Sequence, residues 1–175
     1  MNLDPKEMQE KLRDLGIRGV LIITRNGMPL LVRSFVKEGD QIFGKDPALF
    51  SGFLAGLGRF ADDQIQGLLS DIGLHTVRLF FDYTEEMIFL LAFDEIKLTV
   101  LPGYEVRTLV KGTMAEIKSA LQDYFADVDK SIEEIVKDPK LFEHHRDSLN
   151  AIGEVLERIL YKSHLEILKL IESGS

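Results

Sequence analysis

The sequence of 175 residues contains no cysteine. A chain without thiols has no disulfide framework, no cysteine-bound zinc or iron–sulfur cluster and no thiol nucleophile. Long hydrophobic runs are also lacking, because the longest, Met87–Phe93, is far short of the ~20 residues that a membrane-spanning helix needs. The N-terminal stretch Met1–Pro5 has neither the basic nor the apolar region of a secretory signal. These absences predict a cytoplasmic protein without membrane insertion.

Basic charge is scarce relative to acidic charge. The chain has 21 lysines and arginines against 29 aspartates and glutamates, which gives a formal net charge of −8 at pH 7. A surface of that sign repels the phosphates of nucleic acids and of anionic lipids, so we expect neither as a main partner. The hydrophobic content of 45% and the charged content of 29% are those of an ordinary globular protein.

The four histidines, His75, His144, His145 and His164, do not have the spacing of metal ligands. His144 and His145 are adjacent, so on a helix they point about 100° apart and cannot easily hold one ion. The sequence also offers no candidate nucleophile with a base placed to activate it. We therefore expect no metal, no cofactor and no catalytic residue, and a protein that is not an enzyme.

Two apolar runs, residues 19–24 and 30–35, flank the dipeptide Asn26-Gly27. Asn-Gly favours a type I′ turn, because both central residues of that turn take positive φ and these two do so at little cost. The first part of the chain is therefore predicted to be a β-hairpin.

A second hairpin is predicted from Val77–Tyr83 and Glu86–Phe93, preceded by a weaker strand within residues 68–75. Since Met87–Phe93 is apolar at every position, we expect that strand to be central and covered on both faces. Ile96–Leu101 either prolongs it or forms an irregular link. The predicted fold class is α+β, with a five-stranded antiparallel sheet (β-β-α-β-β-β) flanked by helices, an N-terminal helix and a C-terminal helical pair.

Three Asp-Pro pairs mark predicted helix starts, because Asp can cap free backbone N–H groups and Pro suits the first helical position. They are Asp4-Pro5, Asp46-Pro47 and Asp138-Pro139. A fourth start is predicted at Thr113, which has the capping-box spacing to Glu116. We expect residues 1–137 to form the main domain and residues 138–175 a C-terminal helical extension packed on it.

The predicted central helix, Pro47–Phe60, combines an apolar stripe with a strip of small residues. Each glycine in a helix costs about 1 kcal/mol relative to alanine, so this strip calls for an explanation. It accommodates either a neighbouring part of the same chain or an intermolecular contact, and the sequence favours neither. The stripe expected to face the sheet is Leu49, Phe50, Phe53, Leu54 and Leu57, and the small strip, a candidate partner or dimer interface, is Ala48, Gly52, Gly56 and Arg59.

The apolar segment Leu165–Ile171 near the end of the chain is also expected to be buried, because an exposed apolar patch of this kind promotes aggregation. Either the protein's own sheet and preceding helix bury it, or a dimer or partner helix does.

Three stretches resemble longin/roadblock-type domains, with a profilin-like α/β fold, and are most similar to the longin-like and roadblock-like proteins of archaea. They are GVLIITRNGMPLLVRSF, DPALFSGFLAGLGRFADD and LHTVRLFFDYTEEMIFLLAFDE. The helix expected before the first strand is similar to the roadblock arrangement. The resemblance implies a non-catalytic adaptor or scaffold that binds small Ras-like GTPases or trafficking-type complex partners, regulates them, and forms homo- or heterodimers.

The alternative function is a small-molecule sensor of the PAS or profilin-like kind, which also uses an antiparallel sheet with flanking helices. An internal pocket lined by Phe80, Phe81 and Phe89, with a buried polar group, would favour the sensor. A filled core and an interface on the central helix would favour the adaptor.

Overall fold

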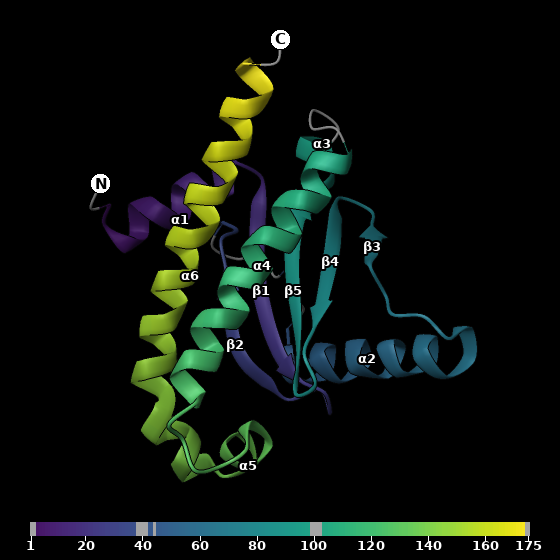
Figure 1. Cartoon of the computed structure of the whole chain (residues 1–175), viewed down its shortest axis with the longest axis vertical. Helices are drawn as coiled ribbons and strands as arrows, with labels where there is room; N and C mark the ends of the chain where they lie inside the picture. Colours follow the sequence, from purple (N-terminus) through teal and green to yellow (C-terminus); the bar gives the residue numbers. More distant parts are fainter. Residues whose placement is uncertain (1–2, 38–41, 44, 99–102, 174–175) are drawn as a thin grey trace.

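The computed structural model describes residues 3–37, 42–43, 45–98 and 103–173. Five strands form one antiparallel sheet in the order β2-β1-β5-β4-β3 (Figure 1). Chain order gives two strands, a helix and then three strands, so the predicted α+β class is confirmed. The strands are β1 (Ile17–Thr24), β2 (Pro29–Ser34), β3 (Asp71–Leu74), β4 (Val77–Tyr83) and β5 (Met87–Asp94).

Helices surround this sheet, and three of them begin at the Asp-Pro pairs. Asp4, Asp46 and Asp138 each accept backbone N–H hydrogen bonds through the side chain, so the three predicted caps are confirmed. No described helix combines the length and the apolarity needed to cross a membrane. The helices are α1 (Pro5–Asp14), α2 (Pro47–Phe60) with a π-helical turn η1 (Ala61–Ile65), α3 (Glu95–Leu98), α4 (Gly103–Phe125), α5 (Ile132–Lys137) and α6 (Pro139–Ser173).

The sheet separates two hydrophobic clusters of unequal size. Because side chains alternate along a strand, Ile22, Phe89 and Leu91 face the larger cluster, which α1, α4 and α6 complete. Their neighbours Leu21 and Leu90 face the smaller cluster on the α2 side. Figure 1 shows α4 and α6 running side by side across the sheet, whereas α2 extends away from it. As predicted, β5 is buried on both faces.

The C-terminal helices depart from the prediction at one point. The helix expected to begin at Thr113 begins at Gly103, and Thr113 lies buried in its interior instead of capping it. Packing against α6 stabilises α4, and that outweighs a local capping signal. Residues 95–98 form the short helix α3, so they neither prolong β5 nor form an irregular link, and residues 99–102 lie outside the described ranges.

The first hairpin has a different turn from the predicted one. Asn26 does not take positive φ, and only Gly27 does, at +88°. The N–H of Gly27 donates to the carbonyl of Thr24 (2.9 Å), which makes Arg25 and Asn26 the centre of the turn. This is a type I turn followed by a left-handed glycine, so the prediction of a type I′ turn was wrong. The loop is longer than the two residues that a type I′ turn connects.

Candidate interaction surface

The contacts of α2 decide which of its faces is available. Ser51, Leu54 and Ala55 point to the sheet and are fully buried, and Phe50 packs against Phe43 with ring centroids 5.9 Å apart. The backbone of α2 also meets the first turn, since a Cβ added at Gly27 would lie 2.8 Å from the Cα of Gly52. The helix is therefore fixed along one narrow side.

Two residues of the apolar stripe expected to face the sheet lie on the opposite side of α2. Leu49 is 75% exposed and Phe53 is 64% exposed, so the prediction that both face the sheet was wrong. Apolar residues occur around most of this helix, so their periodicity is compatible with more than one buried side. The close contact with Gly27 selects the side that carries Ser51 and Ala55.

The strip of Ala48, Gly52, Gly56 and Arg59 lies in solvent. A Cβ built on Gly52 or on Gly56 meets no atom within 4 Å. The described part of the chain thus leaves the strip uncovered, and its role in an intermolecular contact stays a prediction.

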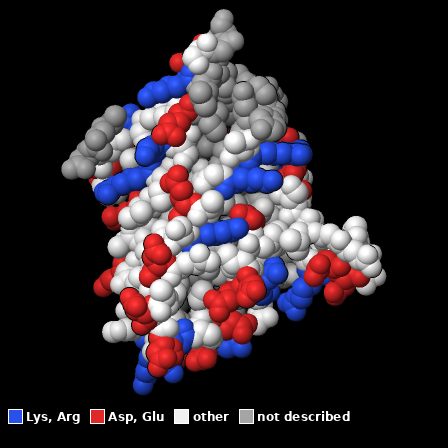
Figure 2. All heavy atoms as spheres, in the orientation of Figure 1, with Lys and Arg blue, Asp and Glu red and all other residues white. Residues whose placement is uncertain are grey.

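Exposed apolar side chains continue from α2 into η1 and the segment that follows it. In Figure 1 this arm projects beyond the sheet, and in Figure 2 its surface is mostly uncharged apart from a few acidic and basic groups. A protein that stays monomeric seldom leaves so many large apolar groups together in water. We call the following residues the α2–η1 face: Leu49, Phe53, Phe60, Ile65 and Leu68.

Beside this face, a hollow of about 190 Å³ lies between α2 and the end of the sheet. Ala55 and Ile88 form its apolar floor, and Tyr83 forms a wall. The Tyr83 hydroxyl donates to the carbonyl of Leu69 (2.9 Å), and burial raises the pKa of Tyr83 to about 12. The guanidinium of Arg25 lies 5.4 Å from the centre of the Tyr83 ring, in a cation–π contact. We call this the arginine hollow.

A groove of about 540 Å³ runs along β2, which is one edge of the sheet. Leu30 and Val32 of the strand form one side of it, and Phe142 and Leu149 of α6 form the other. An edge strand with open backbone groups can pair with another extended chain, so this groove is a second surface at which a partner could bind.

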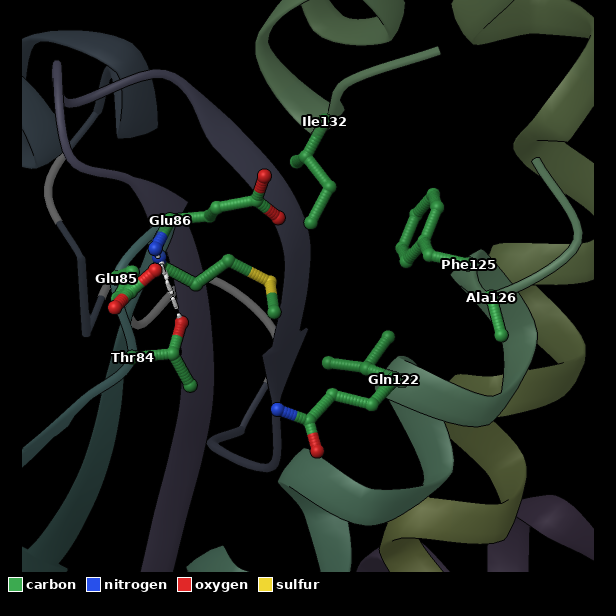
Figure 3. Close-up of a pocket in the computed structure, with 9 residues that line it drawn as sticks. Thr84, Glu85, Glu86, Gln122, Phe125, Ala126 and Ile132 are labelled. Atoms are coloured by element: carbon green, nitrogen blue, oxygen red, sulfur yellow. Dashed lines mark hydrogen bonds between the residues drawn. The ribbon is translucent and has the colours of Figure 1, made fainter. Parts of the chain in front are cut away.

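A third hollow, of about 340 Å³, separates the β4–β5 turn from α4 and α5 (Figure 3). Phe125 and Ile132 give it an apolar wall, and Gln122 points from α4 towards the hairpin. Thr84 Oγ1 accepts the backbone N–H groups of Glu86 (3.3 Å) and Met87 (2.9 Å), which fixes the turn. The Thr84 hydroxyl thus serves to hold the hairpin turn.

Two of the four histidines pack against residues of other elements in the described molecule. His145 Nδ1 lies 2.7 Å from the Tyr124 hydroxyl, and His164 is buried against the ring of Phe93. Burial lowers the pKa of His164. Within the described ranges, no three histidine or acidic side chains are grouped closely enough to hold a metal ion.

One buried polar cluster fastens α6 to the rest of the protein, and the sequence pattern did not reveal it. Glu157 accepts a hydrogen bond from Gln9 of α1 (3.2 Å) and lies 3.8 Å from the Nε of Arg33 on β2. Burial raises the pKa of Glu157. Arg33 also donates to the carbonyl of Asn150 (2.6 Å), so the cluster joins three elements that are distant in sequence.

The three phenylalanines proposed to line a sensor pocket do not come together in one cavity. Phe80 and Phe89 belong to the larger core cluster and Phe81 to the smaller one, on the other side of the sheet. None of them lines the three hollows described above.

No protein family matches the sequence, and no curated protein matches it either. Solved structures do match. A chain of the AP-3 complex, in a homology model of its stretched open conformation, aligns with a TM-score of 0.51 at 12% identity, covering 90% of this chain and 95% of that one. The gliding protein MglB from Thermus thermophilus has 20% identity over 55% of this chain and 78% of its own, with a TM-score of 0.39. The mammalian SRP receptor has 10% identity over 82% and 96%, with a TM-score of 0.38.

The alignment to the AP-3 chain extends over nearly all of both chains. The fold is of the longin/roadblock type, as the sequence resemblance implied. At identities this low the similarity concerns the fold alone, and the archaeal part of the resemblance stays a prediction.

Proposed function

We propose that the protein is a non-catalytic adaptor that binds a small Ras-like GTPase or a related trafficking-type partner and regulates it. The observation that carries the proposal is the α2–η1 face, where large apolar side chains such as Leu49 and Phe53 stand in solvent. Burying such groups against another protein releases roughly 25 cal/mol per Å² of apolar surface, which favours association.

The similar chain of the AP-3 complex belongs, by its name, to a multi-protein assembly, which supports a role in binding partner proteins. A homo- or heterodimer through the exposed side of α2 is part of the proposal, because the strip of Ala48, Gly52, Gly56 and Arg59 would let a second backbone approach this helix closely.

The test compares two variants that remove an exposed apolar side chain at different places. Phe53→Ser changes the α2–η1 face, and Val155→Ser changes an exposed residue of α6 outside it. Binding to small GTPases of the same genome is measured in both nucleotide states, and sedimentation measures self-association. We expect Phe53→Ser to weaken association at least roughly tenfold and Val155→Ser to leave it unchanged. Equal behaviour of the two variants, or no association of the wild type with any of these proteins, contradicts the proposal.

A further inference from the structure

Two arginines that line the arginine hollow make no ion pair with another described residue. Arg25 comes from the β1–β2 turn and Arg59 from the last turn of α2. Within the described ranges neither guanidinium has a carboxylate within 4.0 Å, whereas Arg18 and Arg78 are both in ion pairs. An arginine fork held at a hollow without a carboxylate partner is prepared to bind one.

A contact within the protein restrains Arg25 before any ligand arrives. Its guanidinium lies over the ring of Tyr83, and that ring is held by the hydrogen bond to Leu69 and by stacking on Phe81 at 6.4 Å. Because the ring contact limits the conformations of this side chain, binding an anion costs less conformational entropy than at an arginine without such a contact.

Gly58 keeps the hollow open. It is half-buried and lines the hollow, and a Cβ built on it meets no atom within 4 Å. A glycine at this helical position costs about 1 kcal/mol relative to alanine, and no close contact in the described molecule requires it. The absent side chain therefore leaves space that a ligand can occupy.

The chemistry of the lining selects the ligand. Ala55, Ile88 and Leu68 offer an apolar surface to a short aliphatic stem, while the two guanidinium groups suit an anionic head. Asp62 also lines the hollow, so the three charged side chains of the lining sum to +1, which balances one negative charge on the ligand and leaves a second one unbalanced. This arrangement favours a single carboxylate over a phosphate dianion.

We propose that the arginine hollow binds the carboxylate of a glutamate or aspartate side chain on the partner protein that covers the α2–η1 face. Leu68 belongs both to that face and to the hollow, and Arg59 of the hollow precedes Phe60 of the face, so a protein seated on the Phe60 and Leu68 end of the face lies beside the mouth. The assignment to a partner rests on the proposed function, whereas the carboxylate site itself can be tested without any partner.

The first experiment uses butyrate, a carboxylate on a short aliphatic stem, as the probe. We expect saturable shifts of the Ala55 and Ile88 methyl signals in NMR spectra of the whole protein. Affinity should fall roughly tenfold in Arg25→Gln and in Arg59→Gln, and it should be unchanged in Arg158→Gln, which removes an exposed arginine elsewhere. Gly58→Leu should fill the hollow and abolish the shifts.

Two outcomes overturn the carboxylate site. One is that butyramide, which has the same shape without the charge, shifts the same signals at the same concentrations. The other is wild-type butyrate affinity in both arginine variants. Methyl phosphate binding more tightly than butyrate would overturn the choice of a monoanion. All variants change exposed or half-buried positions, and circular dichroism verifies their fold.

The second experiment decides the source of the carboxylate. In the association assay described above, we expect Arg25→Gln and Arg59→Gln to weaken partner binding and Arg158→Gln to leave it unchanged. Wild-type partner binding by variants that no longer bind butyrate overturns the assignment to a partner side chain. A protein that binds butyrate but associates with no GTPase and no second copy contradicts the proposed function and leaves the carboxylate site standing.

Discussion

The two faces of the sheet are covered very differently. On one face α1, α4 and α6 supply residues such as Leu12, Leu121 and Leu156 to a large cluster of buried side chains. On the other face α2 buries Leu54 and Ala55 and leaves Leu49 and Phe53 in water. The first face stabilises the fold, and the second keeps apolar surface that another molecule can bury. Substitutions on the two faces should therefore affect different measurements.

The largest effect is expected where α2 touches the sheet domain. Gly27→Val should lower the free energy of unfolding by roughly 3–5 kcal/mol, because a β-branched residue is strained at φ +88° and its Cβ would lie 2.8 Å from the Cα of Gly52. Urea denaturation measures the change. Gly112→Ala, at an open position of α4, is the control and should stabilise the protein slightly. If the Gly27→Val variant is as stable as the wild type, α2 does not pack on this turn.

The next prediction compares the loss of stability caused by truncating one side chain on each face of the sheet. Leu156→Ala should cost about 3 kcal/mol, since Leu156 is buried in the larger cluster and its truncation leaves a cavity. Phe53→Ala should change stability by less than about 0.5 kcal/mol, because its ring is mostly in solvent. Both are measured by urea denaturation at low protein concentration, where association does not contribute. Similar losses in the two variants would refute the asymmetry of the faces.

Substitutions in the glycine strip should weaken association with another protein and leave the fold intact. Gly52→Leu and Gly56→Leu have open space around the new side chain, and leucine is the better helix former, so the fold should be retained or slightly stabilised. Self-association or partner binding should weaken at least roughly tenfold, because the added side chain keeps another backbone away. Sedimentation beside circular dichroism tests this. Unchanged association would place the interface elsewhere, at the β2 edge or on α6.

The smallest expected effect is a pH dependence of the stability, which comes from His164 on the face covered by α1, α4 and α6. Burial lowers the pKa of His164, so its contribution to stability is present above about pH 6.5 and is lost as the pH falls towards the folded-state pKa. Melting temperatures of the wild type and of His164→Leu should therefore diverge as the pH falls from 7.5 to 5.5, in favour of the variant. A difference that stays constant over this range would contradict a titrating role for His164.

Much of the fold could be predicted because its signals are local. The three Asp-Pro pairs specify helix starts through hydrogen bonds within three residues of each Asp. The apolar run Met87–Phe93 specifies a strand buried on both faces. Local signals gave wrong predictions at two places. At Thr113 the packing of α4 decides where the helix begins, and at Asn26 the length of the hairpin loop decides the type of turn.

The candidate site was less predictable because it depends on contacts between distant residues. The sequence singled out Ala48, Gly52, Gly56 and Arg59, and the structure leaves them uncovered. It did not single out Arg25 or Tyr83, since their proximity to Arg59 exists only after the first turn packs beside α2. The cluster of Glu157, Gln9 and Arg33 was also missed, because its members are brought together only by the fold.

The sequence by itself determined the order of the strands along the chain, the position of the helix between them and the three caps, since each depends on neighbouring residues. Only the tertiary structure decided which side of α2 is buried, because an apolar helix has several sides that could face a sheet. The contact of Gly27 with the backbone of α2 selected one of them, and in doing so left Leu49, Phe53 and the glycine strip facing solvent.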